Sequence, residues 1–304
     1  MKSLRIIAAM AAIAPAVAAC GGSSAGASSE PNVVASFYPY AFVAQQIAGD
    51  HATVTNLTAP GLEPHDLELT PQQVADIQDA TVVIYEKGFQ PAVDEAVDQS
   101  AQGLTLDTTS VVPLEDTGAP AEPNDPGEPA LTGDPHVWLD PIRLATITEA
   151  IAAELSRADA AHAADYHANA ARLLARLHAL DRDYREGLAH CERTQFVTSH
   201  AAFGYLAQRY GLQMIAISGL SPDAEPSPKR LSDLEALVRQ DGITTIFSEV
   251  LVSPALADTL ARDVGVKTAV LDPIEGLPSA DSQQNYLTIM RANLAALRQA
   301  NGCR

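Results

Sequence analysis

The sequence predicts an α/β protein of two lobes, each a parallel β-sheet with flanking helices, joined by one long α-helix. Short apolar strands alternate with amphipathic helices in both halves of the chain, which is typical of parallel sheets. Between the halves, residues 141–189 show an almost wholly helical pattern. The chain of 304 residues is also long enough for two lobes of moderate size.

Four strands are predicted in the first half. They are rich in β-branched residues and about six residues long, as buried strands commonly are. The helices between them open near prolines, and Thr70 can cap one of these helices while Pro71 suits its first turn. The strands are expected at 32–37, 52–57, 80–85 and 104–107, and the helices begin near Pro39, Thr70 and Pro91.

The middle of the chain contains a loop and then two helices. Residues 113–135 are rich in proline and acidic side chains and show no regular pattern, which predicts a loop. Helices are predicted over 141–157 and 158–190, and the second would span roughly 45 Å at the usual helical rise. Beyond it the alternation resumes, with strands at 194–199, 212–218, 243–249 and 267–272 and a last helix from about 283 to 299.

The N-terminus has the pattern of a secretory signal: a basic start, an apolar run of small residues and then Cys20. The run is too short for a membrane span. Residues 17–20, VAAC, resemble the bacterial lipobox, whose cysteine is lipid-modified. The alternative is an ordinary signal peptidase site that leaves Cys20 as a stray thiol. Residues 21–30 are rich in Gly and Ser, as flexible tethers are.

These patterns divide the chain into five parts, and they place it in the cell envelope, anchored by lipid on the outer side of the cytoplasmic membrane. The parts are a signal peptide (1–19), the lipidated Cys20 with its tether (20–31), an N-terminal lobe with the acidic loop 113–135 (32–157), the linking helix (158–190) and a C-terminal lobe (191–304).

Charge and cysteine content narrow the function further. The net charge of −19 disfavours nucleic acid as a partner, because phosphate binding needs a basic face. An acidic surface favours cations only diffusely.

If Cys20 carries lipid, Cys191 and Cys303 remain as an even pair in an oxidising compartment, which favours a disulfide. The sequence does not show that their Cα atoms come within bridging distance.

Four residues that can bind metal lie where open α/β sheets bind ligands, beyond the carboxyl ends of strands. His200 and Asp272 each follow a predicted strand directly, whereas His65 and His136 lie in or at the end of loops after strands. A lone histidine beside a strand is more often a hydrogen-bonded structural residue. Three imidazoles and a carboxylate from two lobes, however, would make a four-coordinate site that suits zinc.

The stretch DPHVWLDP, residues 134–141, restricts the backbone around His136 through two Asp-Pro steps. An imidazole held in this way has little conformational freedom left to lose on binding. Asp140 or a nearby carboxylate could hold the second ring nitrogen of His136. We expect Trp138, the only tryptophan, to pack in the core of the lobe.

Several segments together resemble the ZnuA-like zinc and manganese ABC-transporter lipoproteins. They are GLEPHDLELTPQQVADIQDATVVIY, DPHVWLDP, TSHAAFGYLAQRYGL, FSEVLVSP and AVLDPIEGL, and the similarity runs from about Val33 to the C-terminal helix. The resemblance implies that His65, His136, His200 and Asp272 bind the metal. Glu249 matches a recurrent family glutamate, and we expect it to contact a histidine ligand and not the metal.

The resemblance implies a carrier that captures Zn²⁺ and delivers it to an ABC permease with its ATPase subunit. We expect a monomer that is not an enzyme. Histidine at position 200, where manganese carriers tend to have glutamate, indicates zinc, and a nitrogen-rich site agrees. Imidazoles must be neutral to bind metal, so affinity should fall as the pH drops toward about 5.5. The alternatives are a manganese or iron carrier of the same fold, a zinc hydrolase and a metal-dependent adhesin.

Overall fold

The computed structural model describes residues 30–119 and 133–304. The predicted signal peptide, Cys20, nearly all of the tether and the centre of loop 113–135 therefore lie outside the described residues. Within the described ranges, no helix has the length and apolar composition needed to cross a bilayer.

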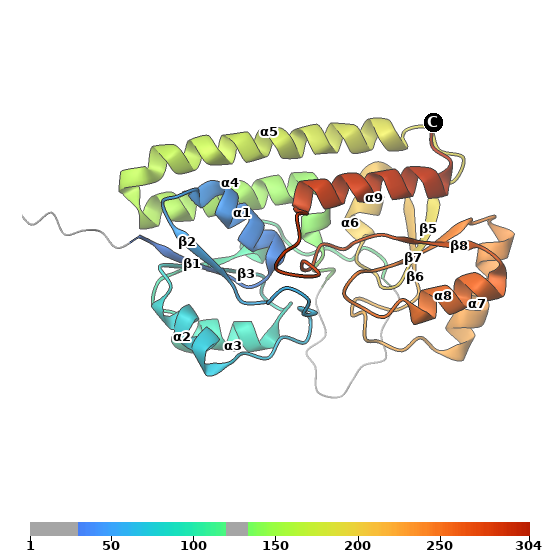
Figure 1. Cartoon of the computed structure of the whole chain (residues 1–304), viewed down its shortest axis with the longest axis horizontal. Coiled ribbons are helices and arrows are strands. Elements are labelled where there is room, and N and C mark those ends of the chain that lie inside the picture. Colours follow the sequence, from blue (N-terminus) through green and yellow to red (C-terminus); the bar gives the residue numbers. More distant parts are fainter. Residues whose placement is uncertain (1–29, 120–132) are drawn as a thin grey trace, which may run out of the picture.

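Two parallel sheets of the same topology form the two lobes (Figure 1). In the N-terminal lobe the order is β2-β1-β3-β4, and in the C-terminal lobe it is β6-β5-β7-β8. The strands are β1 (Asn32–Ala35), β2 (Thr53–Asn56), β3 (Val82–Tyr85), β4 (Leu104–Asp107), β5 (Gln195–Thr198), β6 (Gln213–Ala216), β7 (Thr245–Ser248) and β8 (Lys267–Val270). Every strand prediction is confirmed, and in all but β4 one or both ends are shorter than predicted by one or two residues.

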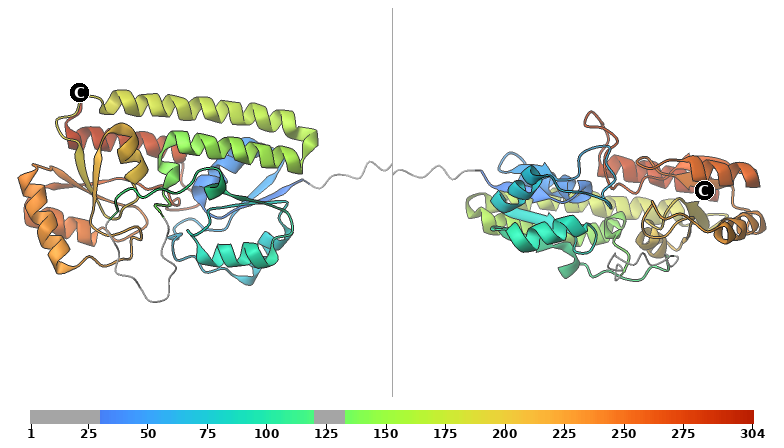
Figure 2. Two further views of the ribbon diagram at one scale, coloured as in Figure 1. Left: turned by 180° about the vertical axis from the view of Figure 1, so that it is seen from behind. Right: turned by 90° about the horizontal axis from the view of Figure 1, so that it is seen from below.

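Helices cover both faces of each sheet. They are α1 (Tyr38–Ala48), α2 (Pro71–Asp79), α3 (Pro91–Ser100), α4 (Pro141–Ala158), α5 (Ala163–Leu188), α6 (Gly204–Tyr210), α7 (Pro228–Gln240), α8 (Ala255–Val264) and α9 (Tyr286–Asn301). Seen from in front and from behind, α4, α5 and α9 lie along one side of the molecule, whereas α2, α3, α7 and α8 lie on the other (Figures 1 and 2).

Side chains alternate along the strands between two different cores, as the pleat of a strand requires. In β1, Val33 and Ala35 face the helices α1, α4 and α5, while Val34 faces the opposite core with α2 and α3. Phe247 and Ile246 of β7 divide in the same way in the C-terminal lobe. The core on the α5 side is continuous through both lobes, so the lobes share one apolar interior.

The long helix α5 runs across both lobes (Figure 1). The sequence predicts it from residue 158, but a 3₁₀ turn at Ala160–His162 separates α4 from α5, so α5 begins at Ala163. Leu173, Leu177 and Leu180 of α5 are buried at helical spacing in the shared core. α5 packs against α4, α1 and α9 and thereby joins the lobes.

Hydrogen bonds also link the lobes through Trp138. The indole nitrogen of Trp138 donates to the backbone oxygen of Pro273 over 2.7 Å, and the hydroxyl of Tyr286 donates to the backbone oxygen of Trp138 over 2.7 Å. The Trp138 side chain is fully buried against Phe37 and Phe89. The prediction that Trp138 packs in the core is confirmed, and the same side chain fixes the position of the C-terminal segment.

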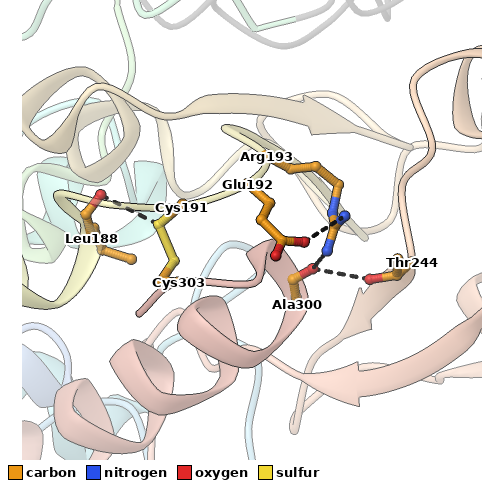
Figure 3. The surroundings of a disulfide bond; sticks show 7 residues. All are labelled: Leu188, Cys191, Glu192, Arg193, Thr244, Ala300 and Cys303. Atoms are coloured by element: carbon orange, nitrogen blue, oxygen red, sulfur yellow. Dashed lines mark hydrogen bonds and ion pairs between the residues drawn. A yellow bond between two sulfur atoms is a disulfide. The ribbon is translucent and has the colours of Figure 1, made fainter.

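A disulfide joins Cys191 to Cys303, as the cysteine count favoured (Figure 3). The backbone N–H groups of Glu192 and Arg193 both donate to the carbonyl of Asn301, which continues the contact beyond the bridge. The end of α9 is therefore held against the segment that leads into β5.

We expect the double substitution Cys191→Ser with Cys303→Ser to destabilise the protein. The bridged cysteines are 112 residues apart, and the loop-entropy model gives a cross-link of such a segment up to about 4–5 kcal/mol of stability. Urea unfolding would measure the loss. Reductant should lower the midpoint of the unaltered protein and leave that of the double variant unchanged; equal midpoints for both proteins without reductant would contradict the prediction.

Candidate metal centre

Four side chains that can bind metal converge at one point. They are His65, His136, His200 and Glu275, and one ligand atom from each lies within 4.8 Å of the others. Nε2 of His136 lies 3.2 Å from Nε2 of His200. Oε1 of Glu275 lies 3.5, 3.3 and 3.2 Å from Nε2 of His65, His136 and His200. Tetrahedral zinc with bonds of about 2.0–2.1 Å separates its ligand atoms by about 3.3 Å, so this geometry suits zinc.

The topology explains why residues so far apart in sequence meet. His65 lies in the loop after β2, and His200 lies two residues beyond the end of β5. His136 directly precedes a 3₁₀ turn at Val137–Leu139, and Glu275 lies in the segment after β8. Each lobe thus contributes two of the four side chains, beyond the carboxyl ends of its strands.

Two of the four ligand atoms are buried without a hydrogen bond. Among the described residues, neither Nε2 of His65 nor Oε1 of Glu275 has a hydrogen-bond partner. A buried polar group without a partner is costly unless something else satisfies it. A cation bound by all four side chains would satisfy both atoms, and four protein ligands would leave no open position of the kind that catalytic zinc requires.

Carboxylates fix two of the imidazoles from behind. Asp134 Oδ1 lies 2.7 Å from Nδ1 of His136 and also accepts from the His136 backbone N–H. Glu249 Oε2 lies 2.8 Å from Nδ1 of His200, and Oε1 of Glu249 accepts from the backbone N–H of His200. A carboxylate at Nδ1 makes that nitrogen the proton donor and leaves Nε2 to the metal.

Asp140 has a different role from the one suggested by the sequence. Its side chain accepts from the backbone N–H groups of Ile142 and Arg143 and so caps α4, and it forms an ion pair with Arg209 of α6. Asp134, and not Asp140, contacts Nδ1 of His136. The reason is geometric: Asp134 and His136 flank Pro135 in a tight turn, whereas the 3₁₀ turn directs residue 140 away toward the helix.

The structure brings the three predicted histidines together but leaves Asp272 outside the group. Oδ1 of Asp272 accepts from the backbone N–H of Ile274, and the backbone of Asp272 pairs with the side chain of Asn293. Ile274 has a positive φ of 60°, and Glu275 follows it. This local turn brings Glu275 to the imidazoles. Sequence reasoning missed Glu275 because no periodic pattern marks a reversal of this kind.

Protonation of the site follows from its burial and its charges. Burial opposes the charge on His200, but the carboxylates of Glu249 and Glu275 outweigh it and raise the pKa of His200 well above its usual value. His136 is similar, with burial outweighed by Asp134 and Glu275, so its pKa is also raised. For His65 burial prevails and lowers the pKa. The three imidazoles overcome burial at Glu275 and hold its pKa well below the usual range.

Two further carboxylates border the site. Burial, with the nearby charge of Glu275, raises the pKa of Glu63 to about 8. Burial raises the pKa of Asp272 to about 6. In the metal-free protein at neutral pH, the net charge of the cluster is therefore less negative than its number of carboxylates suggests.

A protein-family model described as "Zinc-uptake complex component A periplasmic" matches residues 33–300. The chain belongs to this family. The resemblance seen in the sequence is thus confirmed, and so is the fold of two parallel-sheet lobes. The Zn(II)-bound ZnuA-like domain of Streptococcus pneumoniae AdcA superposes with a TM-score of 0.74 at 39% identity, covering 90% of this chain and 99% of that domain.

Two zinc proteins of the family show the extent of the similarity. The zinc-binding lipoprotein AdcA of S. pneumoniae (strain TIGR4) is 41% identical over 277 residues, which is 88% of this chain and 55% of AdcA. The chain thus spans about half the length of that relative. The high-affinity zinc uptake system protein ZnuA of Bacillus subtilis is 34% identical over 297 residues, 93% of each chain.

We expect the affinity for zinc to fall as the pH drops below neutrality. For histidines with the usual pKa, the affinity would begin to fall only at a lower pH. Because Glu249 and Glu275 raise the pKa of His200 well above its usual value, zinc must displace a proton from this imidazole near pH 7. Calorimetric titration in buffers of different ionisation enthalpy would count the protons released. Release of at least one proton per zinc is expected; release of none, with affinity constant from about pH 8 to about pH 6, would contradict the assignment.

Proposed function

We propose that the protein captures Zn²⁺ outside the cytoplasmic membrane and delivers it to an ABC permease and its ATPase subunit for import. One observation carries the proposal: three imidazole Nε2 atoms and one carboxylate oxygen are spaced for a single tetrahedral cation. Membership of the zinc-uptake family supports it. The lipobox-like sequence ending at Cys20 supports a lipid anchor.

The metal-binding side chains in this proposal are His65, His136, His200 and Glu275. Three nitrogens and one oxygen favour zinc over manganese, which prefers carboxylate and carbonyl oxygens. The side chains of His136 and His200 are fully buried, and that of Glu275 is 1% exposed, so the ion would leave water entirely. Capture therefore exchanges the hydration shell for fixed ligands, and no group in this arrangement is left to activate water for catalysis.

The substitutions Glu275→Gln and Asp272→Asn distinguish the two candidates for the fourth ligand. Glu275→Gln should weaken zinc binding by more than the 10–100-fold typical of losing an outer partner of a ligand, because a charged donor to the metal is lost. Asp272→Asn should weaken it less, since asparagine keeps the oxygen that accepts from Ile274. Competition with a calibrated chelator would measure both affinities.

Offering Zn²⁺ and Mn²⁺ together in the same titration tests the identity of the metal. One zinc per chain, bound in preference to manganese, is expected of the unaltered protein. If Asp272→Asn weakens binding more than Glu275→Gln does, the ligand set is wrong; if manganese is preferred, the proposed cargo is wrong.

A further inference from the structure

Glu63 is a carboxylate at the edge of the site that the four-ligand arrangement does not use. It lies two residues before His65 in the loop between β2 and α2. Its Oε1 accepts from the backbone N–H of His65 over 2.9 Å and lies 4.0 Å from Nε2 of the same residue. Oε2 of Glu63 is buried, and no described group donates a hydrogen bond to it. Nε2 of His65 and Oε1 of Glu275 are likewise buried without a hydrogen bond.

Solvent exposure decreases from Glu63 into the site. The side chain of Glu63 is 17% exposed and that of His65 is 7% exposed. The corresponding values for His136 and His200 are 0%, and for Glu275 the value is 1%. Among the described side chains of the cluster, Glu63 and then His65 are therefore the first that a cation from solution meets.

The separation of these two residues fits a cation held outside the full site. With bonds of about 2.0–2.2 Å to nitrogen and oxygen, tetrahedral zinc separates two ligand atoms by about 3.3–3.5 Å, and a linear arrangement separates them by about 4.2 Å. The 4.0 Å between Oε1 of Glu63 and Nε2 of His65 lies between these values, so a small rotation of the Glu63 side chain, which is 17% exposed, brings both atoms to one cation. The oxygens of Glu63 do not belong to the mutually close set of four, so a cation held by Glu63 has not reached all the inner ligands.

Stepwise exchange of water would ease passage into the buried site. If a fully hydrated divalent ion moved into a dry site in one step, the whole free energy of removing its hydration shell would oppose that step. A carboxylate and an imidazole at the rim can replace the first waters while the remaining waters still contact the ion.

We propose that Glu63 and His65 form an outer capture position through which zinc enters and leaves the four-ligand site. The inference rests on the proposed function, because it concerns the same ion. Glu63 binds the ion in transit, whereas His65 binds it both in transit and in the final site. Loss of Glu63 therefore changes the rates of exchange more than the equilibrium affinity.

The variant Glu63→Gln tests the proposal, since glutamine keeps an oxygen that can accept from the His65 backbone but cannot ionise to a carboxylate when the cation arrives. Trp138 is the only tryptophan, and its ring lies 5.2 Å from that of His136, so stopped-flow fluorescence can follow the arrival of zinc. Transfer to a chromophoric chelator gives the dissociation rate and a second measure of association. Both rates should fall by about tenfold, with the ratio of the two changing less than either rate.

The matched control is Glu68→Gln, which removes a carboxyl group from an exposed position on the same loop. It should leave both rates near those of the unaltered protein, and Glu63→Asp should restore part of the lost rate. If both glutamine variants slow association equally and leave dissociation unchanged, Glu63 acts only through long-range electrostatic attraction. That result would overturn the proposal. Faster dissociation from Glu63→Gln with unchanged association would also overturn it. Failure of the unaltered protein to bind zinc would instead refute the proposed function.

Discussion

The carboxylate of Glu275, held among three buried imidazoles, is the interaction on which this site depends. Its oxygen lies 3.2–3.5 Å from all three Nε2 atoms. Glu249 and Glu275 raise the pKa of His200 well above its usual value, and Nε2 of His200 lies only 3.2 Å from Nε2 of His136, so a proton held between these rings is stabilised by a nearby anion. Glu275 thus stabilises the protonated, metal-free cluster, and the same oxygen can become a ligand when zinc replaces the protons.

The fold supports this cluster by fixing elements of both lobes relative to each other. The shared core under α5 and α9 joins the two sheets, and Trp138 bonds to the segment that carries Glu275 through the carbonyl of Pro273. Asp134 and Glu249 then orient individual rings. Because lobes, segments and rings are all held by these contacts, the side chains that converge here have little conformational freedom to lose on binding.

The sequence predicts the sheets, the linking helix and three of the four converging side chains, because each rests on a local signal. Strands are marked by β-branched runs; His200 follows a strand closely, His136 stands between two prolines, and His65 lies in the loop after a strand. Glu275 and Asp134 depend on a different kind of information. The turn at Ile274, with its positive φ, and the tight turn around Pro135 decide which carboxylate faces the imidazoles. Glu275 lies three residues beyond Asp272, and no periodic pattern in the sequence marks that position. The sequence therefore favours Asp272, which directly follows the predicted strand.

The most direct test of the account is a crystal structure of the zinc-loaded protein with diffraction data collected on both sides of the zinc absorption edge. The account predicts one anomalous peak per chain, bonded at about 2.0–2.2 Å to Nε2 of His65, His136 and His200 and to a carboxylate oxygen of Glu275. A peak bonded to Asp272 in place of Glu275, or a zinc ion bound outside this group, would contradict it.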